Sequence, residues 1–112
     1  MRLKEILIED DSGMALGYKV MAYKDGKLVS LMDDGVTMTP KIGEVHKMGG
    51  KGIYLGTTKD FVEDYYTGLT DLDEVILTYK YSLSDVTSGD PHAKSGGEIT
   101  VSKGQLVDIE HV

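Results

Sequence analysis

Apolar and polar residues alternate most regularly in the segment 74–83. One set of alternate positions is entirely apolar or aromatic and comprises Val75, Leu77, Tyr79, Tyr81 and Leu83. Because successive side chains of a strand point to opposite faces of a sheet, this alternation predicts one central β-strand. We expect Val75, Leu77, Tyr79 and Tyr81 to point into the core, with Ile76 half-buried behind them.

Several shorter apolar segments predict the other strands. The alternating segment 18–23 is followed by Asp25-Gly26, a pair suited to a tight hairpin turn because both central residues need positive φ. The segment 28–32 then returns along the hairpin. Further strands are predicted at 36–38, 42–46, 53–55, 98–102 and 106–109, and the last two are expected to join at Lys103-Gly104. The glycine-rich segment 47–52 predicts a bent loop, and the polar segment 86–97 is the best candidate for disorder.

One helix is predicted, over about residues 58–66. Its expected apolar face comprises Phe61, Val62, Tyr65 and Tyr66. Thr57 and Asp60 have the spacing of a capping box at its start, and Gly68 is placed to end it in the left-handed conformation. The sequence therefore predicts an α+β fold: a compact, mostly antiparallel β domain of six or seven short strands with one main helix. A length of 112 residues corresponds to a single domain.

The charge of the chain narrows the possible partners. The formal net charge is −7, and the acidic residues cluster at 9–11, 33–34, 63–64 and 71–74. No basic residues cluster in the sequence, so direct binding to nucleic acid is not expected. The acidic clusters favour a solvated surface. The alternative is an acidic decoy that occupies the nucleic-acid groove of another protein.

The composition indicates a cytoplasmic protein. The chain has no cysteine, which fits a reducing cytosol and excludes a disulfide framework. No apolar run approaches the roughly 20 residues that span a bilayer, and acids interrupt the N-terminus where a signal peptide would be apolar. Phosphate-binding and nucleophile motifs are not found, and the three histidines lie far apart. The residues themselves therefore predict no cofactor and no metal site.

One stretch, however, resembles a known enzyme family. Gly50-Lys51-Gly52-Ile53-Tyr54, followed by a helix with Tyr65, a long strand from residue 73, and a strand that begins at Glu98, resembles the ADP-ribosyltransferase (poly(ADP-ribose) polymerase) superfamily. The resemblance covers residues 50–101 and implies an ADP-ribosyltransferase-like core. It implies that Tyr54 stacks on the nicotinamide ring of NAD, that Tyr65 helps to close the pocket and that Glu98 is catalytic.

The chemistry of such a site is consistent with these residue types. A cationic nicotinamide ring would stack favourably on Tyr54, and a carboxylate at Glu98 would stabilise positive charge that develops on the ribose. The family carries a histidine or arginine on its first strand as a further grip on the cofactor. The equivalent segment here, 17–20, offers only Lys19, whose point charge does not replace a forked arginine contact. A purely structural alternative is that Gly52 permits a turn and Tyr54 packs in the core.

A second resemblance covers more of the chain. The motifs Tyr18-Lys19-Val20, Gly43-Glu44-Val45-His46, Gly52-Ile53-Tyr54 and Gly89-Asp90 resemble those of small accessory proteins encoded by bacteriophages. This resemblance implies a non-catalytic binding module that acts on a host protein in the host cytosol, with no cofactor. The alternative function is a small ADP-ribosyltransferase-like enzyme that binds NAD through Lys19, Tyr54 and Tyr65.

Overall fold

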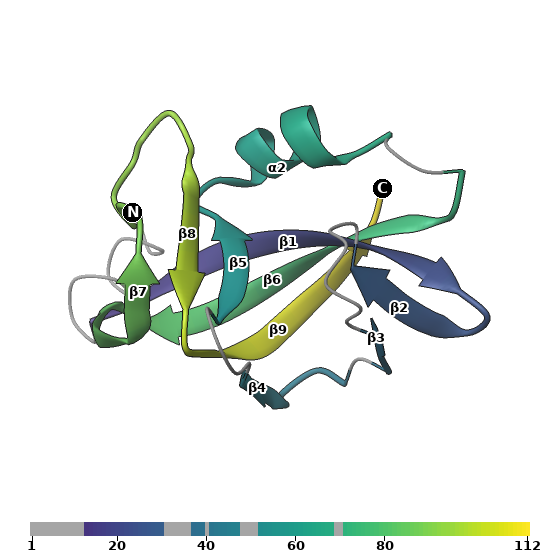
Figure 1. The fold of residues 1–112 in the computed structure, drawn as a ribbon, viewed down its shortest axis with the longest axis horizontal. Coiled ribbons are helices and arrows are strands. Elements are labelled where there is room, and N and C mark those ends of the chain that lie inside the picture. The colour runs from purple at the N-terminus through teal and green to yellow at the C-terminus, as the bar shows by residue number, and fades with distance from the viewer. Residues whose placement is uncertain (1–12, 31–36, 40, 48–51, 69–70) are drawn as a thin grey trace, which may run out of the picture.

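The computed structural model describes residues 13–30, 37–39, 41–47, 52–68 and 71–112 (Figure 1). These residues form nine strands, one α-helix and one 3-10 turn. The strands are β1 (Met14–Lys24), β2 (Lys27–Ser30), β3 (Thr37–Met38), β4 (Val45–Lys47), β5 (Ile53–Gly56), β6 (Glu74–Ser82), β7 (Val86–Ser88), β8 (Glu98–Val101) and β9 (Lys103–His111). The helix is α2 (Lys59–Tyr66), and the 3-10 turn is η1 (Leu83–Asp85).

All described strand pairs are antiparallel, in the order β4-β9-β6-β1-β5-β8-β7, with β2 between β1 and β3. The longest pairing joins β1 to β6, from Met14 opposite Ser82 to Ala22 opposite Glu74. The other edge of β1 is shared, because β5 pairs with it at Tyr18 and β2 pairs with it at residues 21–24. The α+β, mainly antiparallel class is therefore confirmed, with more strands than the six or seven predicted.

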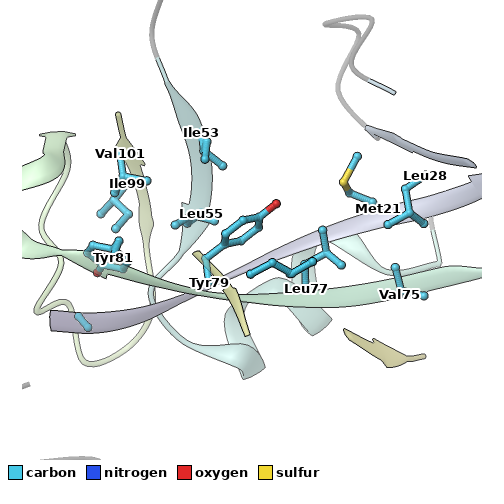
Figure 2. Packing of buried hydrophobic residues seen from close by; sticks show 12 residues of the cluster. Met21, Leu28, Ile53, Leu55, Val75, Leu77, Tyr79, Tyr81, Ile99 and Val101 are labelled. Carbon is cyan, nitrogen blue, oxygen red and sulfur yellow. The ribbon is translucent and has the colours of Figure 1, made fainter. Parts of the chain in front are cut away.

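The sheet is strongly bent around one core. β5, β7 and β8 cross the long strands β1, β6 and β9 steeply (Figure 1). The space between the two parts of the sheet holds a cluster of buried side chains (Figure 2). It comprises Ala15, Met21, Leu28, Ile53, Leu55, Val75, Leu77, Tyr79, Tyr81, Ile99, Val101 and Leu106. The inward direction predicted for Val75, Leu77, Tyr79 and Tyr81 is confirmed.

The opposite face of β1 and β6 is covered by α2. Val62 of the helix packs on Val20 and Ile76, with Tyr18, Phe61 and Tyr66 around them. Ile76 is only 3% exposed, so the prediction that it would be half-buried was wrong. The helix lies close to the sheet because Gly56 has no side chain, and a Cβ there would lie 2.3 Å from Val62 Cγ1.

Of the two predicted tight turns between strands, one is present in the structure and the other is not. Asp25 and Gly26 both have positive φ, 54° and 80°, which confirms the predicted hairpin turn. Gly104, by contrast, is not in a turn but inside β9, and only Ser102 separates β8 from β9. Gly104 packs closely on the core, since a Cβ there would lie 3.2 Å from the ring of Tyr79. The predicted loop at 47–52 and the end of the returning hairpin strand lie mostly outside the described residues.

The segment 86–97 is not a plain loop. It begins with β7, which pairs with β8, and its later part is tied to Thr57. The Thr57 hydroxyl donates to the Ala93 carbonyl at 3.2 Å and accepts from the Gly97 N–H at 3.0 Å. Thr57 therefore holds this segment and does not cap the helix.

The helix begins one residue later than the capping-box spacing indicated. Thr58 is its N-cap, and the Thr58 hydroxyl accepts the Phe61 N–H at 3.1 Å. At the other end, Gly68 has φ 76° as predicted, and its N–H donates to the Glu74 carboxylate at 2.7 Å. The sequence placed the helix correctly but assigned its cap to the wrong threonine.

We expect Leu77→Ala to lower the free energy of unfolding by about 2–5 kcal/mol, because Leu77 is fully buried and its removal leaves a cavity. Urea denaturation measures the change. Val107→Ala, at a half-exposed position of the neighbouring strand β9, is the matched control and should change stability by about 0.5 kcal/mol or less. An equal loss in both variants would contradict the inward direction of Leu77.

Thr58→Ala and Thr57→Ala should destabilise the protein at different places. Thr58→Ala removes the cap, at a cost of about 1 kcal/mol, and should speed amide hydrogen exchange at Phe61. Thr57→Ala removes the two loop contacts and should instead speed exchange at Gly97. Thr58→Ser keeps the capping oxygen and should restore protection at Phe61. Faster exchange at Phe61 in Thr57→Ala, with none in Thr58→Ala, would reassign the cap to Thr57.

Candidate functional site

The strand arrangement expected around Tyr54 and Glu98 is present. β5, which carries Tyr54, pairs with β8, which begins at Glu98. In this pairing Tyr54 is opposite Thr100 and Gly56 is opposite Glu98. The neighbouring residues Ile53, Leu55, Ile99 and Val101 point into the core, so Tyr54 and Glu98 share the outer face, the face that α2 covers.

Tyr66, and not Tyr65, meets Glu98. The Tyr66 hydroxyl donates to the Glu98 carboxylate at 2.8 Å. Tyr65 is 65% exposed, and its ring lies against Phe61 with the centroids 4.8 Å apart. Burial, reinforced by the Glu98 carboxylate, raises the pKa of Tyr66 to about 12. The tyrosine of α2 that contacts Glu98 is therefore the residue next to the one that the resemblance singled out.

Lys19 lies on the other face of the sheet from Tyr54 and Glu98. In the β1–β6 pairing Lys19 is opposite Leu77, which points into the core. Its neighbour Tyr18 is opposite Gly56 and belongs to the helix side. Because successive side chains of a strand point to opposite faces, Lys19 points away from the outer face. Lys19 therefore does not share the sheet face of Tyr54 and Glu98, and a ligand site that uses Lys19, Tyr54, Tyr65 and Glu98 stays a prediction.

The purely structural alternative, in which Gly52 permits a turn and Tyr54 packs in the core, holds for Gly52 but not for Tyr54. Gly52 has φ 94°, and a Cβ there would lie 2.3 Å from the Val101 carbonyl oxygen, so only glycine fits. Tyr54, however, is half-buried on the outer face and does not belong to either buried cluster. Gly50 and Lys51 lie outside the described residues.

A second surface was not predicted. An open groove of about 660 Å³ lies where β1, β4, β6 and β9 meet η1. Its walls include three lysines, Lys47, Lys80 and Lys103, and we call it the lysine groove. The other lining residues are Met14, Val45, Tyr81, Ser82, Ser84, Asp85, Gly104 and Gln105. The groove therefore gathers three lysines against one aspartate, in a chain whose net charge is −7.

Strand register brings the three lysines together. Lys47 of β4 is directly opposite Lys103 of β9, and Lys80 of β6 is opposite Gln105, two residues further along β9. The side-chain ammonium groups of the three lysines form no ion pair or hydrogen bond with a described residue. They come from three strands that are distant in sequence, so no sequence cluster reveals them. The one available signal was Lys80, a charged residue within the most hydrophobic strand.

The edge strand of the groove is anchored to the core. His46 of β4 makes a 2.6 Å hydrogen bond through Nδ1 to the Tyr79 hydroxyl and a 2.9 Å contact through Nε2 to Glu44. Burial, and secondarily the nearby Glu44 carboxylate, raise the pKa of Tyr79 well above its ordinary value. Gln105 also donates to the Gly43 carbonyl at 3.1 Å. These contacts fix β4, and with it the backbone of Lys47.

Comparison with protein-family models, curated proteins and solved structures finds no significant match to this chain. Among the described residues, no three His, Asp or Glu side chains form a group that would hold a metal ion. No helix in this part of the chain has the length and hydrophobicity needed to cross a bilayer.

The Tyr66–Glu98 contact should make stability depend on pH in the alkaline range. The folded-state pKa of Tyr66 is raised from 10.0 to about 12, so its contribution is complete below pH 10 and is lost as the pH rises towards 12. We expect the free energy of unfolding of the wild type to fall more between about pH 9 and pH 12 than that of Tyr66→Phe. Tyr65→Phe, at an exposed ring, is the matched control and should keep the wild-type dependence. Parallel curves for wild type and Tyr66→Phe would show that the contact is not formed in solution.

Proposed function

We propose that this protein is a non-catalytic binding module, similar in kind to bacteriophage accessory proteins, that binds and modulates a host protein in the host cytosol. The observation that carries this proposal is the lysine groove. Three ammonium groups on adjacent strands of an acidic protein, with no ion-pair partner among the described residues, form a surface of opposite charge to the net charge of the molecule. Such local charge complementarity guides and orients protein association.

The contacts around Glu98 also support a binding module. The Glu98 carboxylate already accepts the Tyr66 hydroxyl, and Tyr65 lies on Phe61. A ribose hydroxyl would have to displace Tyr66, whose ring helps to hold α2 on the sheet. These side chains therefore have packing roles that account for their positions.

An NAD-binding enzyme of the ADP-ribosyltransferase type is the second candidate. It is favoured by the pairing of the strand that carries Tyr54 with the strand that begins at Glu98, which is the arrangement that the resemblance implies. In this alternative the ligand would lie on the outer face, between Tyr54 and Glu98, and an ADP-ribosyltransferase-like core would be the scaffold. Lys19 could not take part directly.

Incubation of the full chain with NAD separates the two functions. We expect no change in melting temperature at millimolar NAD, and no Glu98-dependent transfer of label from labelled NAD. A ligand at about a hundred times its dissociation constant would add about 2.7 kcal/mol of stability, which raises the melting temperature of a domain this size by several degrees.

Glu98→Gln is the comparison variant, and Glu110→Gln on the exposed surface is its matched control. NAD hydrolysis or label transfer that is lost only in Glu98→Gln would replace the binding module with the enzyme. The binding module is tested directly by capturing a host protein and then forming the complex again from the two purified proteins. A complex of fixed stoichiometry supports the binding module.

A further inference from the structure

We propose that the lysine groove is the docking site for an extended acidic segment of the partner protein, whose carboxylates pair with Lys47, Lys80 and Lys103. This inference rests on the proposed function, because it names the surface and the chemistry through which the module binds. It requires a ligand with several negative charges spread over the width of three strands.

The spacing of the strands sets the shape of that ligand. β4, β9 and β6 are consecutive in the sheet, and adjacent strands lie about 4.8 Å apart, so the lysines are distributed across roughly 10 Å. In an extended peptide, side chains on the same side recur about every 7 Å. Two or three acidic residues at alternate positions would therefore meet the three lysines while the peptide crosses the strands.

The positions of the lysines are not explained by protection of the sheet edge. Lysines on edge strands prevent strand-to-strand association, and this role would account for Lys47 on β4. It does not account for Lys80, which lies on β6 between β9 and β1. Lys47 and Lys103 are also directly opposite each other, an arrangement of like charges that destabilises a strand pair. An anionic ligand would relieve that repulsion.

The groove also offers apolar surface between the charges. Val45 is 52% exposed, and it is opposite Gln105 on the same face as Lys47 and Lys103. Met14 lines the far end and is half-buried. A segment that alternates acidic and apolar residues would place carboxylates on the lysines and an apolar side chain on Val45. Because His46 and Gln105 hold β4 in place, little of the backbone needs to be ordered on binding.

A protein segment fits the groove better than a nucleic acid does. Grooves for single-stranded nucleic acid combine basic residues with aromatic rings on which bases stack. The aromatic residue that lines this groove is Tyr81, whose ring is 1% exposed and belongs to the core. Three phosphate contacts would also give little binding energy at physiological salt, and the rest of the acidic chain would repel the remaining phosphates. A short acidic peptide meets less of that repulsion.

Fluorescence anisotropy with labelled synthetic peptides tests the inference. The probe has three glutamates at alternate positions with valines between them, and its control has glutamines in place of the glutamates. We expect the wild type to bind the glutamate peptide saturably, and a variant with Lys47→Gln, Lys80→Gln and Lys103→Gln to bind it about tenfold more weakly. The affinity of the wild type should fall as salt rises from about 50 mM to about 500 mM.

The matched control variant carries Lys24→Gln, Lys27→Gln and Lys94→Gln, three exposed lysines outside the groove. It loses the same charge and should bind the glutamate peptide within about twofold of the wild type. Circular dichroism and thermal melting confirm that each variant is folded. If the triple groove variant does not fold, Lys80→Gln alone should still weaken binding severalfold.

Four outcomes would overturn the inference. They are equal weakening in the two triple variants, no saturable binding by the wild type, equal binding of the glutamine peptide, and tighter lysine-dependent binding of a single-stranded oligonucleotide. None of these results depends on NAD. If the peptide assay fails and the NAD assay is also negative, the module binds through another surface. NAD turnover that requires Glu98 would instead remove the proposed function itself.

Discussion

The pairing of β1 with β6 is the interaction on which the rest of the structure depends. Nine consecutive residue pairs join the two strands, and both of their faces are covered along much of that length. The main cluster packs on one face, and α2 packs on the other through Val20, Val62 and Ile76. Burial on two faces explains why the consecutive apolar residues Val75, Ile76 and Leu77 are all buried, so that burial does not alternate at this end of the strand.

The same pair of strands separates the two candidate sites. On the outer face, α2 covers the part of β6 around Ile76, and the lysine groove begins further along, at Lys80 and Ser82. Ile76 therefore lies under the helix, whereas Lys80 and Ser82 line the groove. Glu98 and Tyr54 belong to the helix side, whereas Lys80 belongs to the groove side. The two candidate sites are separate regions of one sheet face.

Patterns within a single element could be predicted from the sequence. The inward residues of β6, the Asp25-Gly26 turn and the position of the helix each depend on a few neighbouring residues, and each is confirmed. The errors arose where a distant residue decides the outcome. Gly104 looked like a turn glycine until the ring of Tyr79 was placed against it, and Thr57 looked like a cap until the segment 86–97 came within reach of its hydroxyl. The sheet face of Lys19 could not be predicted for a related reason, since a single strand residue has no assigned face until the strand register is known.

The lysine groove shows why a local positive surface in an acidic protein is hard to find from the sequence. Net charge is a sum over the chain, and 19 acids conceal any local excess of the 12 basic residues. Lysines carry most of that positive charge, and a pairing that places Lys47 opposite Lys103 concentrates it where described carboxylates do not neutralise it. Ammonium groups repel one another, so holding these lysines close together raises the free energy of the free protein. The hydrogen bond between His46 and Tyr79 anchors β4 to the core and so holds Lys47 opposite Lys103 despite this repulsion, as the proposed docking of an acidic segment requires.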